Sequence, residues 1–281
     1  MAEVKLRALV LREVDFGDWD RYLTVLAEDG RRVEILCKNA RRGKKTNPAA
    51  RQLCFSEFIL AERGEKYALR EADLVHSFFA LAEDIERYAL ACYLCELTSA
   101  LSDPGLESPA LCRLLLTALL ALERKKRDPA LVKAAFELRV MAESGYAPDL
   151  TSCSICGEAV TAGPVWFSVP AGGIVHESCA RRVGGCMPLD GSALRAVVHV
   201  LSAEPKRLAA FALTGTAAGQ LAALAEQYVR FHLGRGFSSL DFYKSLAGPA
   251  GCAAVSAEVN PLLRVKKKGQ AAVSAEPLTL C

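Results

Sequence analysis

Short apolar runs that alternate with polar positions fill the first 74 residues, and turn-forming segments separate them. Alternation at every second position is typical of strands with one buried face. The five runs are ALVLR, RYLTVLAE, RVEILCK, CFSEFIL and YALREADL. Between the second and third runs, Asp29-Gly30 predicts a hairpin with a type I′ turn, which needs positive φ. Five such strands predict a small barrel; an OB-fold is the commonest solution, and an SH3-like barrel fits the same pattern.

After Leu74 the apolar period changes from that of a strand to that of a helix. Ser108-Pro109 and Asp128-Pro129 each predict a helix N-cap followed by proline at the first helical position. The first helical face, spaced by four and three residues, consists of Leu81, Ile85, Tyr88, Cys92 and Cys95. Further helices are predicted in LCRLLLTALLALERKK, ALVKAAFELRVMAES, SALRAVVHVLSA and AAGQLAALAEQYVRFHLG.

These patterns predict an α+β chain with an N-terminal barrel at residues 1–76 and a helical domain at 77–246. Residues 151–186 lack helical periodicity and concentrate Cys, Gly and Pro, which predicts a compact inserted element held by something other than an apolar core. Residues 247–281 are small, polar and aperiodic, and we expect a mostly disordered tail there.

Composition narrows the class of protein. With 281 residues, 52% hydrophobic and 24% charged, the chain is globular rather than collagenous, coiled-coil or wholly disordered. No apolar stretch approaches the length of a membrane span. The eleven cysteines are odd in number, and the N-terminal apolar run is interrupted by Lys5 and Arg7. We therefore expect a cytoplasmic protein whose cysteines are buried thiols or metal ligands.

Two cysteine pairs carry the spacing of a metal site. Cys153 and Cys156 are two residues apart, and after an intervening stretch His176 and Cys179 repeat that gap. Two such knuckles can complete a tetrahedron around one zinc ion, as in a zinc ribbon. Four protein ligands leave no open position, so the ion would be structural. Cys186 is an alternative fourth ligand to His176.

Other interpretations of these residues are weaker. The alternative for the cluster is that its cysteines are core residues without a metal. We assign that role to Cys92 and Cys95, which lie in an apolar helical stripe. A deaminase needs H-x-E before P-C-x-x-C, and a zinc protease needs H-E-x-x-H; neither motif is present around His176. The remaining histidines are isolated and are expected to be structural.

Positive charge is concentrated in the barrel. Residues 31–51 hold eight Lys or Arg against one acid, a local balance of +7 that leaves about −4 for the rest of the chain, whose net charge is +3. Such a stripe on a barrel is typical of the phosphate-tracking half of a single-strand binding groove. The expected DNA-binding residues are Arg31, Arg32, Lys38, Arg41, Arg42, Lys44 and Lys45. The alternative is a solvated loop with no ligand. The segment is not a Walker loop, because Lys38 stands where that motif has its first glycine.

Aromatic side chains in the same domain are candidates for stacking on bases. Alternation does not decide which of them face outward, and we expect at least three to be core residues. They are Phe16, Trp19, Tyr22, Phe55 and Phe58.

Several segments together resemble the bacterial DNA repair protein RecO family of recombination mediators. ALVLREVDFGDWDRYLTVLAEDGRRVEILCKNARR is similar to the family's first barrel strands and basic loop. FELRVMAESGYAPDLTSCSICG and FSVPAGGIVHESC resemble its Gly-Tyr-x-Pro turn and two zinc knuckles, and YVRFHLGRGFSSL its last core helix. His176 stands where the family often has Cys, and the tail after Leu246 has no counterpart in it.

The resemblance implies an OB-fold, a helical domain and an embedded zinc element. It also implies binding of single- and double-stranded DNA, annealing of complementary strands and, with the partner RecR, loading of RecA onto DNA coated by single-strand binding protein (SSB). The C-terminal tail of SSB would be bound by an apolar pocket of the helical domain with basic residues nearby. A nucleoid-associated location when bound to DNA follows from the same resemblance.

The sequence therefore predicts a non-enzymatic recombination mediator in DNA repair. No Ser/His/Asp order, paired-carboxylate motif or dinucleotide fingerprint is present in the chain. The first alternative is a zinc-ribbon RNA-binding or transcription-associated factor in which the cysteine cluster itself contacts nucleic acid. The second is an enzyme with an unrecognised site.

Overall fold

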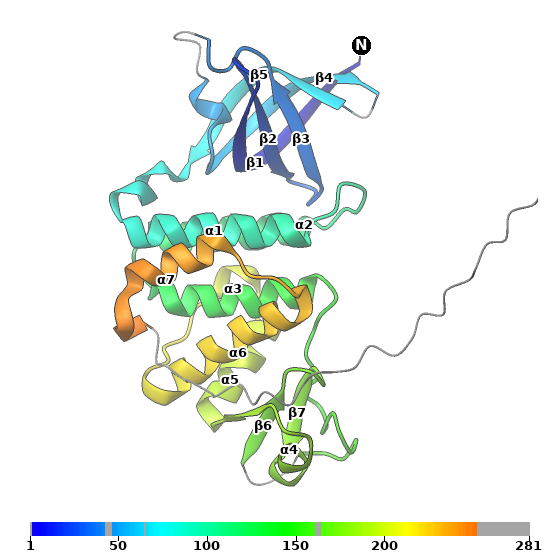
Figure 1. Cartoon of the computed structure of the whole chain (residues 1–281), viewed down its shortest axis with the longest axis vertical. Coiled ribbons are helices and arrows are strands. Elements are labelled where there is room, and N and C mark those ends of the chain that lie inside the picture. The colour runs from blue at the N-terminus through cyan, green and yellow to red at the C-terminus, as the bar shows by residue number, and fades with distance from the viewer. Residues whose placement is uncertain (1, 43–46, 65, 161–163, 252–281) are drawn as a thin grey trace, which may run out of the picture.

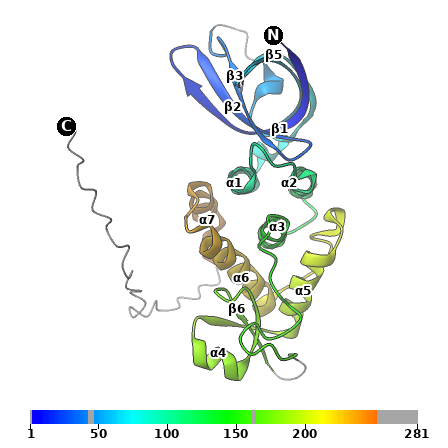
Figure 2. The same ribbon diagram turned by 90° about the vertical axis from the view of Figure 1, so that its right-hand side faces the viewer.

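The computed structural model describes residues 2–42, 47–64, 66–160 and 164–251. A β-barrel lies at one end of the molecule, a cysteine-rich element lies at the other end, and a body of helices fills the space between them (Figures 1 and 2). The last helix continues to Gly251 and so includes the first residues of the segment expected to be a tail at 247–281. Residues 252–281 are outside the described part.

The N-terminal barrel has five strands, as the alternation predicts. They are β1 (Glu3–Phe16), β2 (Asp20–Ala27), β3 (Arg32–Cys37), β4 (Cys54–Arg63) and β5 (Lys66–Ser77). The sheet closes in the order β1-β2-β3-β5-β4, with β3 and β5 parallel and the other pairs antiparallel. This closed, mixed barrel is OB-like, and the short 3₁₀ helix η1 (Pro48–Ala50) contributes Ala49 and Ala50 to its core.

Strand β1 serves two apolar cores because neighbouring side chains point to opposite faces. Ala8 and Val10 lie inside the barrel, whereas Leu9 and Leu11 belong to the core of the helical body. A bulge interrupts the pairing with β2 after Val10. The bulge exchanges the inner and outer positions along the rest of β1.

The β2–β3 hairpin forms with a different turn from the one expected. Gly30 has positive φ (89°), but Asp29 does not, so the type I′ assignment was wrong. The N–H of Gly30 donates to the carbonyl of Ala27 at 2.8 Å, and the N–H of Ser108 donates to the carbonyl of Asp29 at 2.8 Å. The turn is therefore held against the helical body, and a Cβ on Gly30 would lie 1.9 Å from the Ser108 carbonyl oxygen.

We expect Gly30→Ala to destabilise the protein, since alanine meets both an unfavourable φ and this close backbone approach. Left-handed backbone alone costs about 1–2 kcal/mol. Gly64→Ala is the matched control, because Gly64 also has positive φ (61°) but has open space around its Cβ position. Chemical denaturation should show a larger loss of unfolding free energy for Gly30→Ala than for Gly64→Ala. Equal losses would mean that the backbone around Ser108 moves to accept the added methyl group at no cost in stability.

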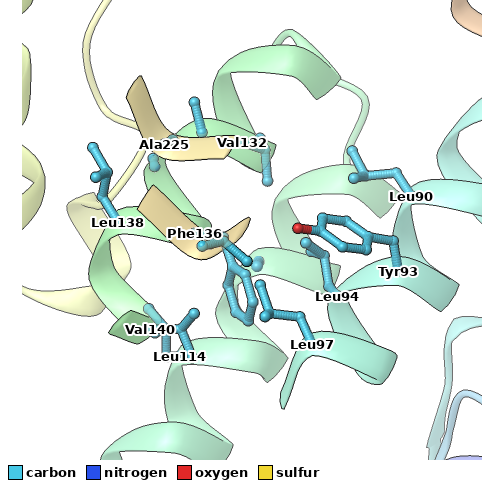
Figure 3. Close-up of a cluster of buried hydrophobic side chains, with 14 of the residues drawn as sticks. Leu90, Tyr93, Leu94, Leu97, Leu114, Val132, Phe136, Leu138, Val140 and Ala225 are labelled. Carbon is cyan, nitrogen blue, oxygen red and sulfur yellow. The ribbon is translucent and has the colours of Figure 1, made fainter. Parts of the chain in front are cut away.

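The helical body is built from α1 (Ile85–Leu101), α2 (Pro109–Glu123), α3 (Pro129–Glu143), α5 (Gly191–Ser202), α6 (Gly215–Leu233) and α7 (Ser238–Gly251), with short 3₁₀ helices η2 (Phe78–Glu83) and η3 (Pro205–Arg207). Helices α1 and α2 lie directly beneath the barrel (Figure 2). Side chains of α1, α2, α3 and α6, including Tyr93 and Phe136, form a continuous buried core (Figure 3). Among the described helices, none is both long and apolar enough to cross a membrane.

The cysteine-rich element is a small sheet of order β7-β6-β8 with one short helix. Its parts are β6 (Val165–Ser168), β7 (Gly173–His176), α4 (Glu177–Val183) and β8 (Cys186–Leu189). One face packs on the helical core, where the rings of Phe167 and Tyr228 lie 5.9 Å apart. The expectation that this element lacks an apolar core was therefore wrong for that face.

Candidate nucleic-acid interface and candidate metal centre

The basic segment of the barrel divides between opposite ends of β3. Arg31 pairs with Asp29 at 2.7 Å. Arg32 donates from Nη1 to the carbonyl of Ser99 at 2.6 Å, which fixes the barrel to α1. Because a strand rises about 3.3 Å per residue, β3 places Lys38 roughly 20 Å from this junction. The structure therefore does not bring Arg31 and Arg32 together with the later cations.

The later cations lie beside the β1–β2 turn. Lys38, Arg41 and Arg42 are exposed. The N–H of Arg41 donates to the carbonyl of Trp19 at 3.0 Å, and the N–H of Asn39 donates to Asp20 Oδ1 at 2.7 Å. These bonds hold residues 38–42 against the turn. Lys44 and Lys45 lie outside the described residues.

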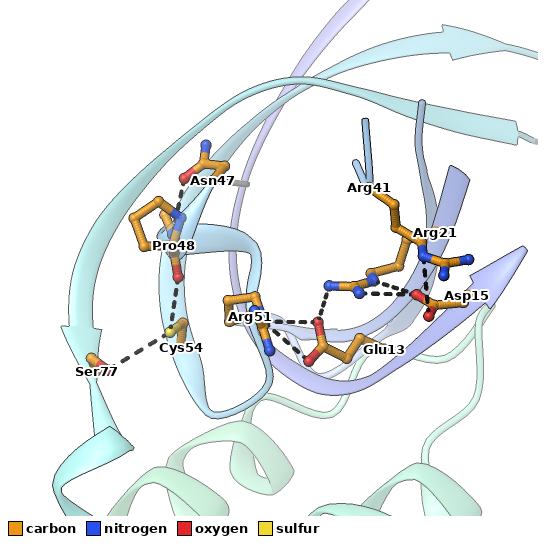
Figure 4. Close-up of polar contacts among 10 residues, drawn as sticks. Glu13, Asp15, Arg21, Arg41, Asn47, Pro48, Arg51, Cys54 and Ser77 are labelled. Atoms are coloured by element: carbon orange, nitrogen blue, oxygen red, sulfur yellow. Dashed lines mark hydrogen bonds and ion pairs between the residues drawn. The ribbon is translucent and has the colours of Figure 1, made fainter. Parts of the chain in front are cut away.

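A chain of ion pairs joins β1, β2 and the segment between β3 and β4 (Figure 4). Arg21 pairs with Glu13 at 2.7 Å and with Asp15 at 2.9 Å. Glu13 also pairs with Arg51 at 3.1 Å, and Asp15 with Arg41 at 3.4 Å. Arg41 is thus partly neutralised, whereas Lys38 and Arg42 make no ion pair with any described residue.

The five aromatic candidates are not equivalent. Phe58 is 1% exposed in the barrel core, and Tyr22 and Phe55 are half-buried. Phe16 and Trp19 are 55% and 51% exposed at the β1–β2 turn, and Arg42 lies over the Trp19 ring, 6.0 Å from its centroid. Only one of the five is fully buried, so the expectation of at least three core aromatics was wrong.

Sequence reasoning missed a second basic surface on the helical body. Residues 124–127 are four consecutive cations in the α2–α3 turn, and all four are exposed. Arg87 donates to the carbonyls of Leu122 and Arg127 and so fixes the backbone of this turn. A sum of charge over four-residue windows would have found the run.

A small pocket of about 80 Å³ opens beside this turn, between α2, the start of α3 and η3. Its apolar wall is made by Ala118, Ala121, Val132, Leu208 and Ala209. Arg127 and Lys206 also line the pocket. The surface thus combines an apolar depression with cations at its edge.

The four residues with zinc-ribbon spacing come together. Ligand atoms of Cys153, Cys156, His176 and Cys179 all lie within 4.8 Å of one another, the only such His/Cys group among the described residues. Cys153 and Cys156 come from the loop after α3, His176 ends β7, and Cys179 lies in the first turn of α4. The arrangement could hold one metal ion.

Close backbone packing brings the two halves of the cluster together. The N–H of Ser154 donates to the carbonyl of Ile174 at 2.9 Å, and the N–H of Asp149 donates to that of Gly172 at 2.8 Å. A Cβ on Gly173 would lie 2.4 Å from the Asp149 carbonyl oxygen, so glycine is required where the segments cross.

The electrostatics of the cluster favour a cation. Burial opposes ionisation of Cys153, but backbone N–H groups of Cys156, His176 and Ile155 outweigh it and lower its pKa to about 6. His176 Nδ1 lies 3.5 Å from the Cys156 sulfur, while its Nε2 lies 3.2 Å from the Ala159 carbonyl oxygen. That carbonyl can accept the Nε2 proton and leave Nδ1 free to bind metal.

The other cysteines do not share this environment. Cys186 lies outside the group of four and donates to the carbonyl of Gly184 at 3.4 Å. Cys95 is buried in α1, where burial raises its pKa well above the ordinary value. All nine cysteines in the described part of the chain are free thiols.

A closed OB-like barrel with exposed cations, joined to a helical body that carries a Cys₃His cluster, is a two-part architecture with recognised sequence relatives. Residues 1–78 match the family described as Recombination protein O N terminal, and residues 82–241 match Recombination protein O C terminal. The chain belongs to the RecO family of DNA repair proteins.

Curated relatives agree with this assignment. DNA repair protein RecO of Acetivibrio thermocellus is 27% identical over 247 residues, covering 88% of this chain and 98% of the relative. DNA repair protein RecO of Desulforudis audaxviator is 29% identical with the same two coverages. DNA repair protein RecO of Caldicellulosiruptor bescii is 26% identical, covering 87% and 99%. Family membership supports a recombination role in DNA repair, with DNA and recombination proteins as partners.

Proposed function

We propose that this protein is a non-enzymatic recombination mediator that binds single-stranded DNA on its barrel. The observation that carries the proposal is the exposed cation group of Lys38, Arg41 and Arg42 beside the β1–β2 turn of an OB-like barrel. Lys44 and Lys45 follow in the same sequence segment. Cations in such a position neutralise phosphates and release counterions, which gives affinity without sequence preference.

Annealing follows from this binding without a catalytic residue. Two complementary strands repel each other through their phosphates, and neutralising both backbones lowers that barrier while their bases remain free to pair. Double-stranded DNA, the product of annealing, would be bound by the same attraction between these cations and its phosphates. Because the chain belongs to the RecO family, the proposal includes cooperation with RecR and the loading of RecA. It also includes a location in the cytoplasm and, when bound to DNA, at the nucleoid.

The helical body offers a site for the C-terminal tail of SSB. An apolar pocket with Arg127 and Lys206 on its lining suits a peptide end that combines an apolar side chain with carboxylates. Residues 124–126 extend the positive field beyond the pocket. We assign the tail to this pocket, so that SSB and DNA bind different parts of the molecule.

The Cys₃His cluster would hold a structural zinc ion. Three sulfur donors and one imidazole nitrogen match the donors that zinc prefers, and all four positions would be filled by protein. Bound zinc would stabilise the crossing of the two knuckles. In the zinc-ribbon alternative the element itself contacts nucleic acid, but Arg181 pairs with Glu177 at 2.6 Å and Arg182 donates to the Cys179 sulfur at 3.1 Å. The geometry therefore favours the barrel as the DNA site.

The two surfaces can be tested against each other. Replacing Arg41, Arg42, Lys44 and Lys45 with Ala should weaken single-strand binding at all sequences alike. If about three phosphate contacts are lost, the salt slope should shrink by about 2, using roughly 0.7 per contact. Replacing residues 124–127 with Ala removes the same charge and is the matched control; it should leave that slope unchanged but weaken binding of an acidic SSB-tail peptide.

Fluorescence anisotropy at several salt concentrations measures both ligands on both variants, and an annealing assay without nucleotide completes the test. An unchanged salt slope in the barrel variant would reject residues 41–45 as a DNA site. Equal peptide affinity in both variants would reject the pocket. Failure of the folded wild-type protein to anneal strands would favour an alternative function.

A further inference from the structure

An aromatic and apolar row crosses the outer face of three strands next to the cations. Val14 of β1 is paired with Tyr22 of β2, which is paired with Leu36 of β3. Directly paired residues point to the same face of a sheet, and this face is opposite the barrel core. Phe16 and Trp19 continue the row at the β1–β2 turn.

This row remains open to solvent in the described part of the chain. Val14, Phe16 and Trp19 are 41%, 55% and 51% exposed. Single exposed apolar side chains are common on protein surfaces, whereas neighbouring ones that form a patch mark an interaction site. The rings of Phe16 and Tyr22 contact each other edge to face, with centroids 5.1 Å apart. Phe16 therefore stands fixed beside Tyr22 with much of its own surface uncovered.

Cations frame the row on both sides. Arg12 precedes Val14 by two residues on the same outer face of β1 and is exposed. At the other end, Lys38 is exposed and Arg42 lies over the Trp19 ring. A hydrogen bond from the N–H of Arg41 to the carbonyl of Trp19 holds the turn against the basic segment. Apolar faces between cations complement a strand that carries bases on one side and phosphates on the other.

We propose that the bases of a single DNA strand stack on Phe16 and Trp19, with Tyr22 supporting Phe16, while Lys38 and Arg42 hold the phosphates. The inference rests on the proposed DNA-binding function and names the part of the surface that reads bases. Stacking requires bases that are free of a partner strand, so these aromatics would make the barrel bind single strands more tightly than duplex. Duplex binding depends on the cations alone.

Two substitutions separate stacking from charge. Phe16→Ala with Trp19→Ala removes two stacking positions and should weaken binding of a thymidine oligonucleotide by roughly 30-fold or more, while leaving the salt slope and the duplex affinity unchanged. Phe79→Ala is the matched control, because Phe79 is 71% exposed but lies on η2, away from this face. It should bind both DNAs as the wild type does.

Trp19 also reports directly on the bound strand, because the chain has only two tryptophans, Trp19 and Trp166. In a Trp166→Phe background, a thymidine oligonucleotide should quench the remaining fluorescence, whereas an abasic oligonucleotide of equal length should bind weakly and leave it unquenched. If Trp166→Phe does not fold, the difference in quenching between the wild type and Trp19→Phe gives the same information.

The outcomes distinguish the two levels of the proposal. If the abasic and thymidine oligonucleotides bind equally and Trp19 is not quenched, the barrel binds DNA through phosphates and the stacking inference is overturned. A parallel loss of single-strand and duplex affinity in the aromatic double variant would also overturn it. If neither oligonucleotide binds the folded wild-type protein, the proposed function itself fails.

Discussion

Replacing Cys153 with Ser should abolish stoichiometric zinc binding and unfold the element around residues 151–189, while the barrel and the helical body stay folded. Cys153 is 1% exposed and its thiolate is stabilised by backbone N–H groups, so it is the ligand least able to be replaced by solvent. Structural zinc sites contribute about 10–16 kcal/mol of apparent binding free energy in small domains. Losing it should leave the knuckle loops without their cross-link.

Cys186→Ser is the matched control, because Cys186 belongs to the same element but lies outside the ligand group. Elemental analysis should find one zinc per chain in the wild type and in Cys186→Ser, and none in Cys153→Ser. Limited proteolysis should then cut Cys153→Ser within the element first. One zinc per chain in Cys153→Ser would contradict the proposed site. Loss of zinc in Cys186→Ser would mean that Cys186, rather than His176, is the fourth ligand.

The Cys₃His cluster shows how much the spacing of residues alone can predict. Two gaps of two residues were enough to predict the four residues that the fold brings together. The same residues did not predict that Phe167 and Ile174 would pack on the helical core, because that contact depends on α6, more than 40 residues away in sequence. The local spacing of residues therefore predicts the two knuckles, but the contacts that support them come from distant helices and cannot be predicted from that spacing.

The barrel shows the same division. Alternation predicted five strands, and their pairing closes them into one barrel in the order β1-β2-β3-β5-β4. Counting charge predicted one basic site, but the hairpin directs Arg32 into the helical junction and Lys38 to the opposite end. The bulge after Val10 also decides which β1 side chains face outward. Residues 8–11 before it are all apolar, so the sequence does not show where the alternation shifts.

A buried ion cluster in the helical body could not be predicted from the sequence, because a Lys and a Glu four residues apart usually lie on a solvated helix face. Lys133 pairs with Glu137 at 2.9 Å and with Glu226 at 3.2 Å, and Tyr93 donates to Glu137 at 2.7 Å. Lys244 of α7 also pairs with Glu226. The cluster therefore joins α1, α3, α6 and α7.

Both charges at the centre of this cluster are buried. The side chain of Glu137 is 0% exposed and that of Lys133 is 7% exposed. Burial raises the pKa of Glu137 despite the nearby ammonium group. Burial also opposes the charge of Lys133, but Glu137 and Glu226 outweigh it and raise the pKa of Lys133. Each charge thus depends on the other to remain in the core.

Replacing Lys133 with Met should destabilise the protein by about 3–5 kcal/mol, because it leaves the Glu137 carboxylate buried without a cation. Arg181→Met is the matched control: it breaks another pair spaced by four residues, but Arg181 is 76% exposed. Removing an exposed partner should change stability by less than about 1 kcal/mol. Urea unfolding of the two variants measures the difference.

The pH dependence identifies the cause of the loss. In Lys133→Met, Glu137 should have a folded-state pKa raised further above its unfolded value, so the folded protein binds the proton more tightly. Stability of the variant should then fall, relative to the wild type, as the pH rises from 5 to 8. Adding Glu137→Gln removes the buried charge while its amide can still accept the Tyr93 hydroxyl, and should recover much of the loss at pH 8. If Lys133→Met is equally destabilised at both pH values and Glu137→Gln recovers nothing, lost packing rather than an uncompensated charge explains the effect.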